Sequence, residues 1–381
     1  MRWSIPLFLA GAAFGAAPTP YGMDDGFDRG TAWGANGYSD TEVRVAISKL
    51  GVSGAQWYRG IATWGDVEPA KGAPSKTYLA RQDFIYEILQ THGIQEYMQL
   101  GGQPKWASSR PDSADFWAYP PVDQAQWSAH VTFMANRFKG KINYWEIGNE
   151  EDWIFWKGDL AQYVAYLKTA YTALKAVDPA NQVLLGGLAS DGLTHWSPQT
   201  PGAKSKAIQQ LYAAGAKGYF DIMNLHAYPA TYKEWEDHIA VAYGEMAKYG
   251  DAGKRLWITE TGFSTLGDAA DKLKAQAAFV RAVYAPLVKH PKVDKVFWYN
   301  LRCKSGEGAN EDNFGLLAND FSARPAYDTL VAVIRDGSAR LQSRDANGIT
   351  AWRLSRRVCD ALGRASARPG RYRAPALLIS D

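Results

Sequence analysis

The stretch Ile142-Asn-Tyr-Trp-Glu-Ile-Gly-Asn-Glu150 decides the interpretation of the fold, together with the two segments that follow it. Its apolar run has the length of a strand and is followed by an amphipathic helical pattern, Leu160–Val177. A second apolar run, Val183-Leu-Leu-Gly-Gly187, comes next. Short apolar runs bounded by turn residues are typical of buried strands, and a strand, helix, strand succession predicts two parallel strands joined by a right-handed crossover.

The same alternation repeats along most of the chain. The predicted strands are Gly30–Gly34, Ala55–Arg59, Gln95–Leu100, Ile142–Ile147, Val183–Gly187, Asp221–Leu225, Leu256–Thr259 and Val296–Leu301. The predicted helices are Thr41–Leu50, Ala80–His92, Gln124–Phe138, Leu160–Val177, Lys204–Gly215, Tyr232–Tyr249, Ala269–His290 and Arg324–Ile334. Such units most economically close into a (β/α)8 TIM barrel, an α/β fold that takes about 250 residues before insertions.

A doubly wound open sheet is the competing fold. That fold usually carries a Gly-rich phosphate-binding turn after its first strand, and the segment Trp33-Gly-Ala-Asn-Gly37 lacks the required spacing. We therefore expect one barrel domain over residues 24–335. Residues 336–381 are expected to form a short C-terminal extension, with a small β addition beginning at Gly337–Leu354 and a partly disordered Arg/Ala/Pro-rich remainder.

The N-terminal segment 1–17 has the pattern of a signal peptide. A positive start, Met1-Arg2, precedes an apolar run that ends in small residues at Ala17. This pattern predicts a secreted or periplasmic protein, and a buried N-terminal strand is the alternative. The run is too short and too rich in Gly and Ala for a good membrane span, so we expect none.

Charge and cysteine content exclude several classes of site. The net charge of the chain is +3. The segment from Arg340 onward contains nine Arg and three Asp, so its charge is 9 − 3 = +6, and the charge of the rest of the chain is +3 − 6 = −3. An acidic body does not support a nucleic-acid groove. Cys303 and Cys359 are the only cysteines, too few for a zinc cluster, and whether they pair is left open. We expect neither metal nor cofactor, and the sequence indicates no oligomeric state.

Chemistry in a barrel gathers where the strands end, because those positions share one face. Glu150 emerges at the end of the fourth strand, where alternation places Glu146, Gly148 and Glu150 on one side. An Asn-Glu pair is common by chance, and a solvated loop carboxylate is the ordinary explanation. In Leu256-Trp-Ile-Thr-Glu260, however, alternation places Leu256, Ile258 and Glu260 on one face and predicts a second carboxylate at the end of the seventh strand. Two such carboxylates face each other across the barrel mouth, and a separation of about 5–5.5 Å suits retaining hydrolysis of a glycoside.

These motifs resemble those of clan A retaining glycoside hydrolases, most closely family 39 and related cellulase-like barrels. The resemblance covers Ala32 to Ile334 and includes Trp64-Gly-Asp-Val-Glu-Pro-Ala-Lys-Gly72, Leu100-Gly-Gly-Gln-Pro-Lys-Trp106 and Asn313–Pro325. It implies that Glu150 is the acid/base and Glu260 the nucleophile of a polysaccharide- or oligosaccharide-cleaving enzyme. Families five and thirty share these key residues, so the choice among xylosides, glucans and mixed polysaccharides stays open.

The resemblance also implies roles for the residues around the two carboxylates. Asn149 is expected to bind the sugar's 2-hydroxyl, Arg59 to support Glu260, and Trp298 to form an aromatic platform beneath the sugar. His226 and Tyr228 are expected near Glu260, although His226 is also explained as a buried barrel histidine. In the loop after Glu150, Trp153 and Trp156 either stack on sugars or cap the barrel rim.

Two other functions compete with hydrolysis. A carbohydrate-binding protein on a glycosidase-like barrel would keep the aromatic residues, but it would be free to lose either Glu150 or Glu260. A barrel oxidoreductase is disfavoured because no phosphate-binding Gly cluster follows strands seven and eight.

Overall fold

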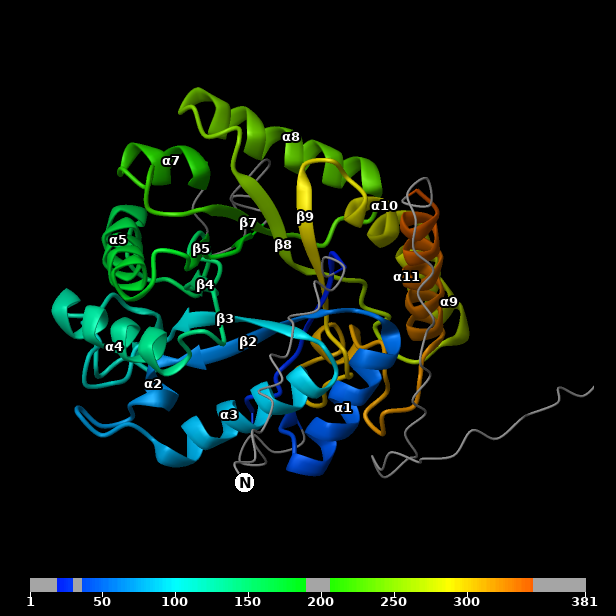
Figure 1. Cartoon of the computed structure of the whole chain (residues 1–381), viewed down its shortest axis with the longest axis horizontal. Helices are drawn as coiled ribbons and strands as arrows, with labels where there is room; N and C mark the ends of the chain where they lie inside the picture. Colours follow the sequence, from blue (N-terminus) through cyan, green and yellow to red (C-terminus); the bar gives the residue numbers. More distant parts are fainter. Residues whose placement is uncertain (1–18, 30–35, 190–205, 345–381) are drawn as a thin grey trace, which may run out of the picture. The chain divides into compact units, whose positions relative to one another are not determined.

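The computed structural model describes residues 19–29, 36–189 and 206–344, and its central element is a closed barrel of parallel strands ringed by helices (Figure 1). The strands are β1 (Tyr21–Asp24), β2 (Trp57–Thr63), β3 (Gln95–Gly101), β4 (Tyr144–Ile147), β5 (Gln182–Leu185), β6 (Leu188–Ala189), β7 (Ile222–His226), β8 (Arg255–Thr261) and β9 (Val293–Tyr299). Pairing of β5 with β7 closes the ring, and β6 pairs with β7 directly after the Gly186-Gly187 interruption. With β5 and β6 as one interrupted strand, this is the predicted (β/α)8 barrel.

The helices lie outside the barrel, between successive strands. They are α1 (Asp40–Ser53), α2 (Trp64–Val67), α3 (Lys76–Thr91), α4 (Gln124–Arg137), α5 (Leu160–Val177), α7 (Ala207–Ala213), α8 (Tyr232–Lys248), α9 (Ala270–Phe279), α10 (Ala285–Val288) and α11 (Pro325–Arg344), with the short turns η2 (Phe116–Ala118), η3 (Val280–Tyr284) and η4 (Glu311–Asn313). Capping boxes at Ser39, Asp159 and Thr231 start α1, α5 and α8, each worth about 1 kcal/mol of helix stability. None of the described helices is long and apolar enough to cross a bilayer.

The first barrel strand differs from the sequence prediction. Gly30–Gly34 lies among residues 30–35, outside the described part of the chain, and β1 at Tyr21–Asp24 fills the position between β9 and β2. This strand is only four residues long, so it shows little periodicity. Gly22 is required in it, because a Cβ there would lie 2.3 Å from the Phe297 ring.

The C-terminal prediction is wrong where it can be tested. Residues 337–344 continue helix α11 and do not begin a β addition. Residues 345–381, like the signal segment predicted over residues 1–17, lie outside the described residues. The chain divides into two units: residues 1–338 contain the barrel, and of residues 339–381 only the end of α11 is described.

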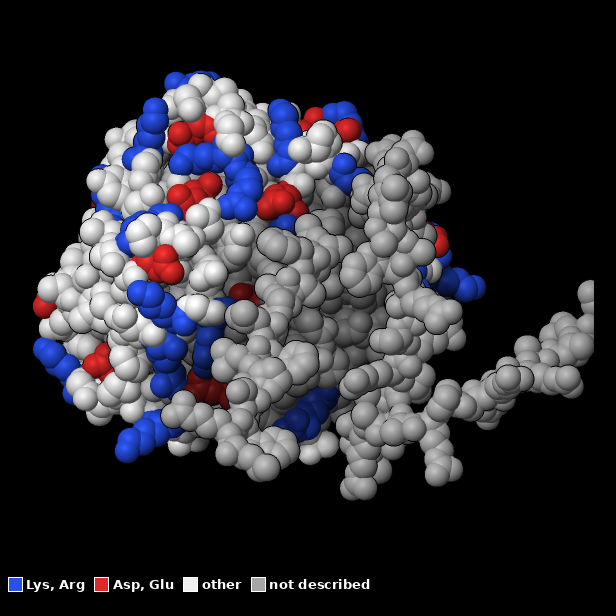
Figure 2. Space-filling model, in the orientation of Figure 1, with Lys and Arg blue, Asp and Glu red and all other residues white. Residues whose placement is uncertain are grey.

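Alternation along the strands separates two apolar layers. The layer inside the barrel forms a plug of large side chains: Trp57, Tyr97, Leu184, Ile222, Trp257 and Phe297. Side chains on the other face of the same strands, such as Tyr58, Trp145 and Trp298, pack against the helices. The plug closes one end of the barrel interior, so a site with access from outside lies at the end where the strands finish. On the face in Figure 2, Lys and Arg are interspersed with Asp and Glu.

Candidate active site

Glu150 reaches the barrel mouth through a turn with unusual backbone angles. Strand β4 ends at Ile147, and both Gly148 (φ 83°) and Glu150 (φ 47°) then adopt the left-handed conformation. That conformation is uncommon for a residue with a side chain, and it occurs preferentially at functional sites. The amide of Glu150 donates to the Gly187 carbonyl at 3.0 Å, which anchors the turn to the interruption between β5 and β6.

Glu260 faces the mouth because of a bulge, which the predicted alternation does not include. Leu225 pairs with Ile258, but the next residue of β7, His226, pairs with Glu260, so one residue of β8 is skipped. Leu256 and Ile258 pack outward with the helices. The expectation that they share a face with Glu260 is therefore wrong, since a bulge re-aims the side chains that follow it.

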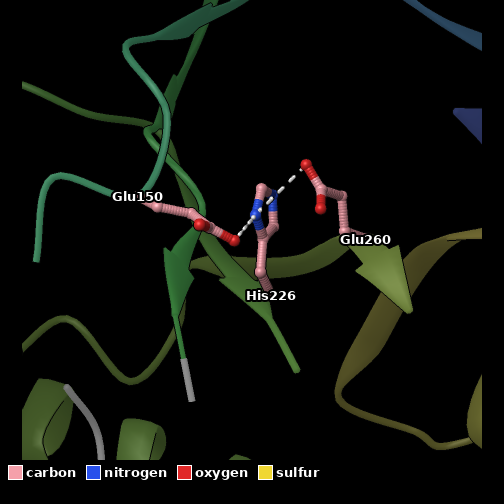
Figure 3. Close-up of side chains that lie close together, drawn as sticks. All are labelled: Glu150, His226 and Glu260. Carbon is pink, nitrogen blue, oxygen red and sulfur yellow. Dashed lines mark hydrogen bonds and ion pairs between the residues drawn. The ribbon is translucent and has the colours of Figure 1, made fainter. Parts of the chain in front are cut away.

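The two glutamates lie on either side of His226 (Figure 3). Its Nδ1 atom is 3.0 Å from Glu150 Oε1 and 3.4 Å from Glu260 Oε1. The nearest oxygens of the two carboxyl groups lie within 4.8 Å of each other. All three side chains are almost completely buried, with exposed fractions of 9% or less for Glu150 and His226 and 12% for Glu260.

Arg59, which points inward from β2, binds several carboxylates at once. Its guanidinium contacts Glu260 Oε1 and lies 2.8 Å from Asp24 Oδ2. It also forms a two-pronged pair with Glu146, with Nε and Nη2 each donating at 2.9 Å. Only 2% of the Arg59 side chain is exposed, and buried cations persist where anions and acceptors surround them. Arg59 therefore lies against Glu260, where the resemblance places it.

Asn149 also contacts Arg59, through its side-chain oxygen. The Nη2 group of Arg59 donates to Asn149 Oδ1 at 2.6 Å. This fixes the amide, since its oxygen must face the cation. The amide nitrogen of Asn149 is then the end of this half-buried side chain that can donate to a ligand.

A polar network lies beneath the glutamates, above the aromatic plug. Glu146 Oε1 accepts from the Gly187 amide and from Asn224 Nδ2, both at 3.1 Å. Asn224 Oδ1 lies 2.9 Å from Thr259 Oγ1, and Thr259 Oγ1 lies 2.7 Å from His226 Nε2. Sequence reasoning placed Glu146 on the face of Glu150 but gave it no role, and it missed Asn224 and Thr259. Alternation could have found Asn224, which stands two residues before His226, but it gives no signal for Thr259, which the bulge in β8 places on the same side as Glu260.

Burial sets the protonation of Glu150 and His226 in opposite directions. Loss of solvation raises the pKa of Glu150 well above its usual value, and the nearby Glu260 carboxylate raises it further. For His226, loss of solvation lowers the pKa well below the usual value, and the positive charge of Arg59 adds to this. Burial therefore favours the protonated form of Glu150 and the neutral form of His226.

Two tyrosines complete the surroundings of Glu260. The hydroxyl of Tyr228 donates to Glu260 Oε2 at 2.8 Å, in agreement with the expected position of this residue. Burial and the Glu260 charge raise the Tyr228 pKa well above its usual value, so the hydroxyl keeps its proton. Tyr299, at the end of β9, meets Tyr228 edge to face with ring centroids 6.2 Å apart.

The expected platform residue, Trp298, does not line the mouth. It is fully buried on the outer face of β9, where it packs against Tyr284 and Phe279, and its Nε1 donates to the Phe314 carbonyl at 3.2 Å. Phe297 and Tyr299 are the inward-facing neighbours, because adjacent residues of a strand point to opposite faces. The prediction was therefore wrong by one position.

The two tryptophans of the loop after Glu150 differ: one caps the barrel rim, and the other remains available to stack on sugars. Trp156 is buried, donates to the Asp159 carbonyl at 2.9 Å and packs on Tyr163, so it caps the rim. Trp153 stays half-buried and meets Phe155 edge to face at 6.2 Å. Phe155 in turn contacts Trp117, which is 36% exposed, at 5.9 Å. These three rings form a partly exposed aromatic cluster beside Glu150.

The described residues contain one group of side chains that could hold a metal ion, and they do not test the pairing of the two cysteines. Among the described residues, Glu150, His226 and Glu260 form the one group of three ligand-type side chains close enough to hold an ion. His226 already has hydrogen-bonding contacts at both ring nitrogens, with Glu150 and Thr259, so the group is complete without a metal. Cys303 is buried, and Cys359 lies outside the described residues.

Comparison with known proteins agrees with this arrangement. Residues 162–326 match the family model described as glycosyl hydrolase catalytic core, a segment that contains His226, Tyr228 and Glu260. Over 149 residues the chain is 26% identical to a probable glucan endo-1,3-beta-glucosidase of Emericella nidulans, covering 38% of this chain and 30% of that protein.

Solved structures show the same fold over most of the chain. A family 39 glycoside hydrolase from Bacteroides cellulosilyticus superposes with a TM-score of 0.63 at 20% identity, over 83% of this chain and 63% of that one. An exo-beta-1,4-mannosidase from an Opitutaceae bacterium gives 0.62 at 17% identity, over 84% and 60%. The chain thus spans less than two thirds of the length of these three proteins. These structures confirm the predicted barrel fold.

Proposed function

We propose that this protein is a retaining glycoside hydrolase that cleaves O-glycosidic, β-linked bonds in an oligosaccharide or polysaccharide. Glu150 acts as acid/base and Glu260 as nucleophile. The observation that carries the proposal is the spacing of their carboxyl groups, whose nearest oxygens lie within 4.8 Å. Retaining enzymes hold the pair about 5–5.5 Å apart, whereas inverting enzymes leave about 6.5–9.5 Å for a water molecule.

In the first step, an oxygen of Glu260 attacks the anomeric carbon while Glu150 gives its proton to the glycosidic oxygen. The bond to the leaving group breaks and a glycosyl ester of Glu260 forms. Arg59 and Tyr228 each donate to one Glu260 oxygen, so they orient the carboxylate toward the sugar. The raised pKa of Glu150 favours the protonated form that this step requires.

In the second step, Glu150 is ionised and takes a proton from water, which attacks the anomeric carbon and releases Glu260. Two inversions give a product with retained configuration. Asn149 supports both steps, because the amide nitrogen left by its contact with Arg59 is placed to donate to a sugar hydroxyl next to the reacting carbon.

The aromatic cluster of Trp117, Trp153 and Phe155 belongs to the leaving-group side of the site in this proposal. Trp153 and Phe155 follow Glu150 directly in the chain and Trp117 packs on Phe155, and the acid/base must lie beside the glycosidic oxygen that it protonates. Sugar rings present apolar faces that stack on exposed aromatic rings. A sugar unit beyond the cleaved bond is the ligand that this surface fits.

The experiment that tests the proposal measures release of reducing sugar from a panel of β-linked substrates, including xylan, mannan and a 1,3-glucan. The parent protein should hydrolyse at least one of them, and Glu150→Gln and Glu260→Gln should not. Binding to these polysaccharides without hydrolysis would contradict the proposal and favour a carbohydrate-binding protein. Loss of activity in neither variant would place the site elsewhere.

A further inference from the structure

We propose that Asn224 and Thr259 are positioning residues that fix the tautomer of His226 and thereby keep the acid proton on Glu150. The proposal rests on the proposed function and deepens it. It follows from the hydrogen-bonding directions in one buried chain of contacts, which runs from Arg59 through Glu146, Asn224, Thr259 and His226 to Glu150.

The first contacts in this series fix the orientation of the Asn224 side-chain amide. Glu146 accepts two hydrogen bonds from Arg59, one from the Gly187 amide and one from Asn224. The backbone amide of Thr259 can only donate, and it donates to Asn224 Oδ1 at 3.3 Å, so this oxygen faces Thr259. The group of Asn224 that faces Glu146 is therefore the NH2.

The next contact fixes the hydroxyl of Thr259. Asn224 Oδ1 cannot donate, so at 2.9 Å the hydroxyl hydrogen of Thr259 points toward it. The Thr259 oxygen is then left with lone pairs for its second contact, which is His226 Nε2 at 2.7 Å. His226 must be the donor in that contact, so Nε2 carries the hydrogen.

The last contact places the acid proton. His226 is neutral, because burial and the Arg59 charge hold its pKa well below the usual value, and a neutral imidazole carries one ring hydrogen. Nδ1 is therefore a bare acceptor that lies 3.0 Å from Glu150 Oε1. A contact this short needs a hydrogen, and Glu150 is the partner that can supply it.

The negative charges around His226 and Glu150 also favour a proton on Glu150. Glu260 lies 3.4 Å from Nδ1 and Glu146 lies 3.9 Å from Nε2. Glu260, Asp152 and Glu151 each raise the Glu150 pKa by their negative charge, and Arg59 opposes them. Tyr228, also near, keeps its proton.

A fixed tautomer suits both halves of a double displacement. After Glu150 has given its proton to the leaving group, its ionised oxygen faces the lone pair of Nδ1, which is unfavourable. Glu150 then regains a proton readily from the attacking water. The opposite tautomer would donate from Nδ1 to ionised Glu150 and would stabilise that form, which lowers the Glu150 pKa, leaves less of the protonated acid for the first step and makes the carboxylate a weaker base for the second.

The direct test is 15N NMR of the histidine ring nitrogens in the full chain, with the His226 signals assigned by their loss in His226→Gln. We expect His226 to be neutral, with hydrogen on Nε2 and none on Nδ1. Hydrogen on Nδ1 would overturn the proposal. This measurement needs no turnover, so its result is separate from the fate of the proposed function.

The second test compares Thr259→Val with Thr259→Ser in pH profiles of kcat/KM. Valine removes the acceptor for Nε2–H, so the Nδ1–H tautomer becomes accessible. We expect the basic limb to move down by about one pH unit and hydrolysis of a poor leaving group to fall roughly tenfold. An activated aryl glycoside should be hydrolysed at the parent rate, and serine, which keeps the hydroxyl, should restore the parent profile.

A Thr259→Val profile that matches the parent would overturn the proposal. So would an equal loss on both classes of leaving group that serine also shows, since that result indicates packing alone. If the valine variant does not fold, the comparison of parent and Thr259→Ser with the NMR result still decides the outcome.

Discussion

Glu150 and Glu260 lie on opposite sides of His226, and their surroundings differ in the sign of the nearest charge. Glu150 is close to the neutral ring of His226 and to the carboxylates of Glu260 and Asp152, and burial raises its pKa well above the usual value. Glu260 faces the Arg59 guanidinium and the Tyr228 hydroxyl. In the proposed mechanism, these environments suit two identical side chains to proton transfer and to nucleophilic attack, which is the general way in which one site uses two carboxyl groups.

The largest expected effect comes from the Glu260 side. Glu260→Gln keeps the shape of the side chain but removes the attacking oxygen, so no glycosyl-enzyme forms. We expect kcat to fall by roughly 10⁴–10⁶-fold. Steady-state rates on an aryl glycoside measure this, with Glu87→Gln, an exposed position on α3, as the matched control. Substantial residual activity would contradict the role of Glu260.

A smaller effect on the same side is expected from Tyr228→Phe. The variant removes one hydrogen bond to Glu260 Oε2 and keeps the ring contacts with Tyr299 and Phe314. A hydrogen bond to a charged group contributes about 1.5–3 kcal/mol, so kcat/KM should fall roughly 10–100-fold. Tyr86→Phe on α3 is the control. An unchanged rate would show that Arg59 alone orients the nucleophile.

The Glu150 side predicts the pH dependence. The first step needs Glu150 in its protonated form, and the pKa of Glu150 is raised. We therefore expect kcat/KM to be at its maximum below that pKa and to fall as the pH rises through it. Beyond the limb the loss is about tenfold per pH unit. Glu150→Gln, assayed with an activated aryl glycoside, should lack this limb. Persistence of the same limb in the variant would assign it to another group.

The smallest effect is expected at the aromatic cluster beside Glu150. Trp117→Ala removes a partly exposed ring that packs on Phe155. We expect KM for a polymeric substrate to rise by roughly 2–10-fold, with little change for a short aryl glycoside that does not reach the cluster. Equal changes for both substrates would remove the cluster from the leaving-group side.

The sequence predicted the residues at strand ends better than the directions in which strands point their side chains. Arg59, Asn149, His226 and Tyr228 all lie around the two glutamates, because a barrel brings strand ends together whatever their spacing in the chain. The helix Leu160–Val177 was predicted with its observed bounds, because it is long and its apolar residues recur regularly on one face.

The errors have local causes. The pairing of β9 with β1 and β8 decides which of its residues point into the barrel. The sequence of one strand does not reveal this, so Trp298 was wrongly predicted to point inward. The bulge in β8 likewise depends on its partner strands. Asn224 and Thr259 were missed because a polar residue inside a barrel strand gains its role only from cross-strand contacts.

The most direct test of the central assignment is the stereochemistry of the azide products formed by two variants. In Glu150→Ala, an activated aryl glycoside should still form the glycosyl-enzyme, and azide should release a product of retained configuration. In Glu260→Gln, azide should replace the missing carboxylate and give a product of inverted configuration. Proton NMR of the anomeric centre distinguishes the two. Inverted product from Glu150→Ala together with retained product from Glu260→Gln would show that the roles are exchanged.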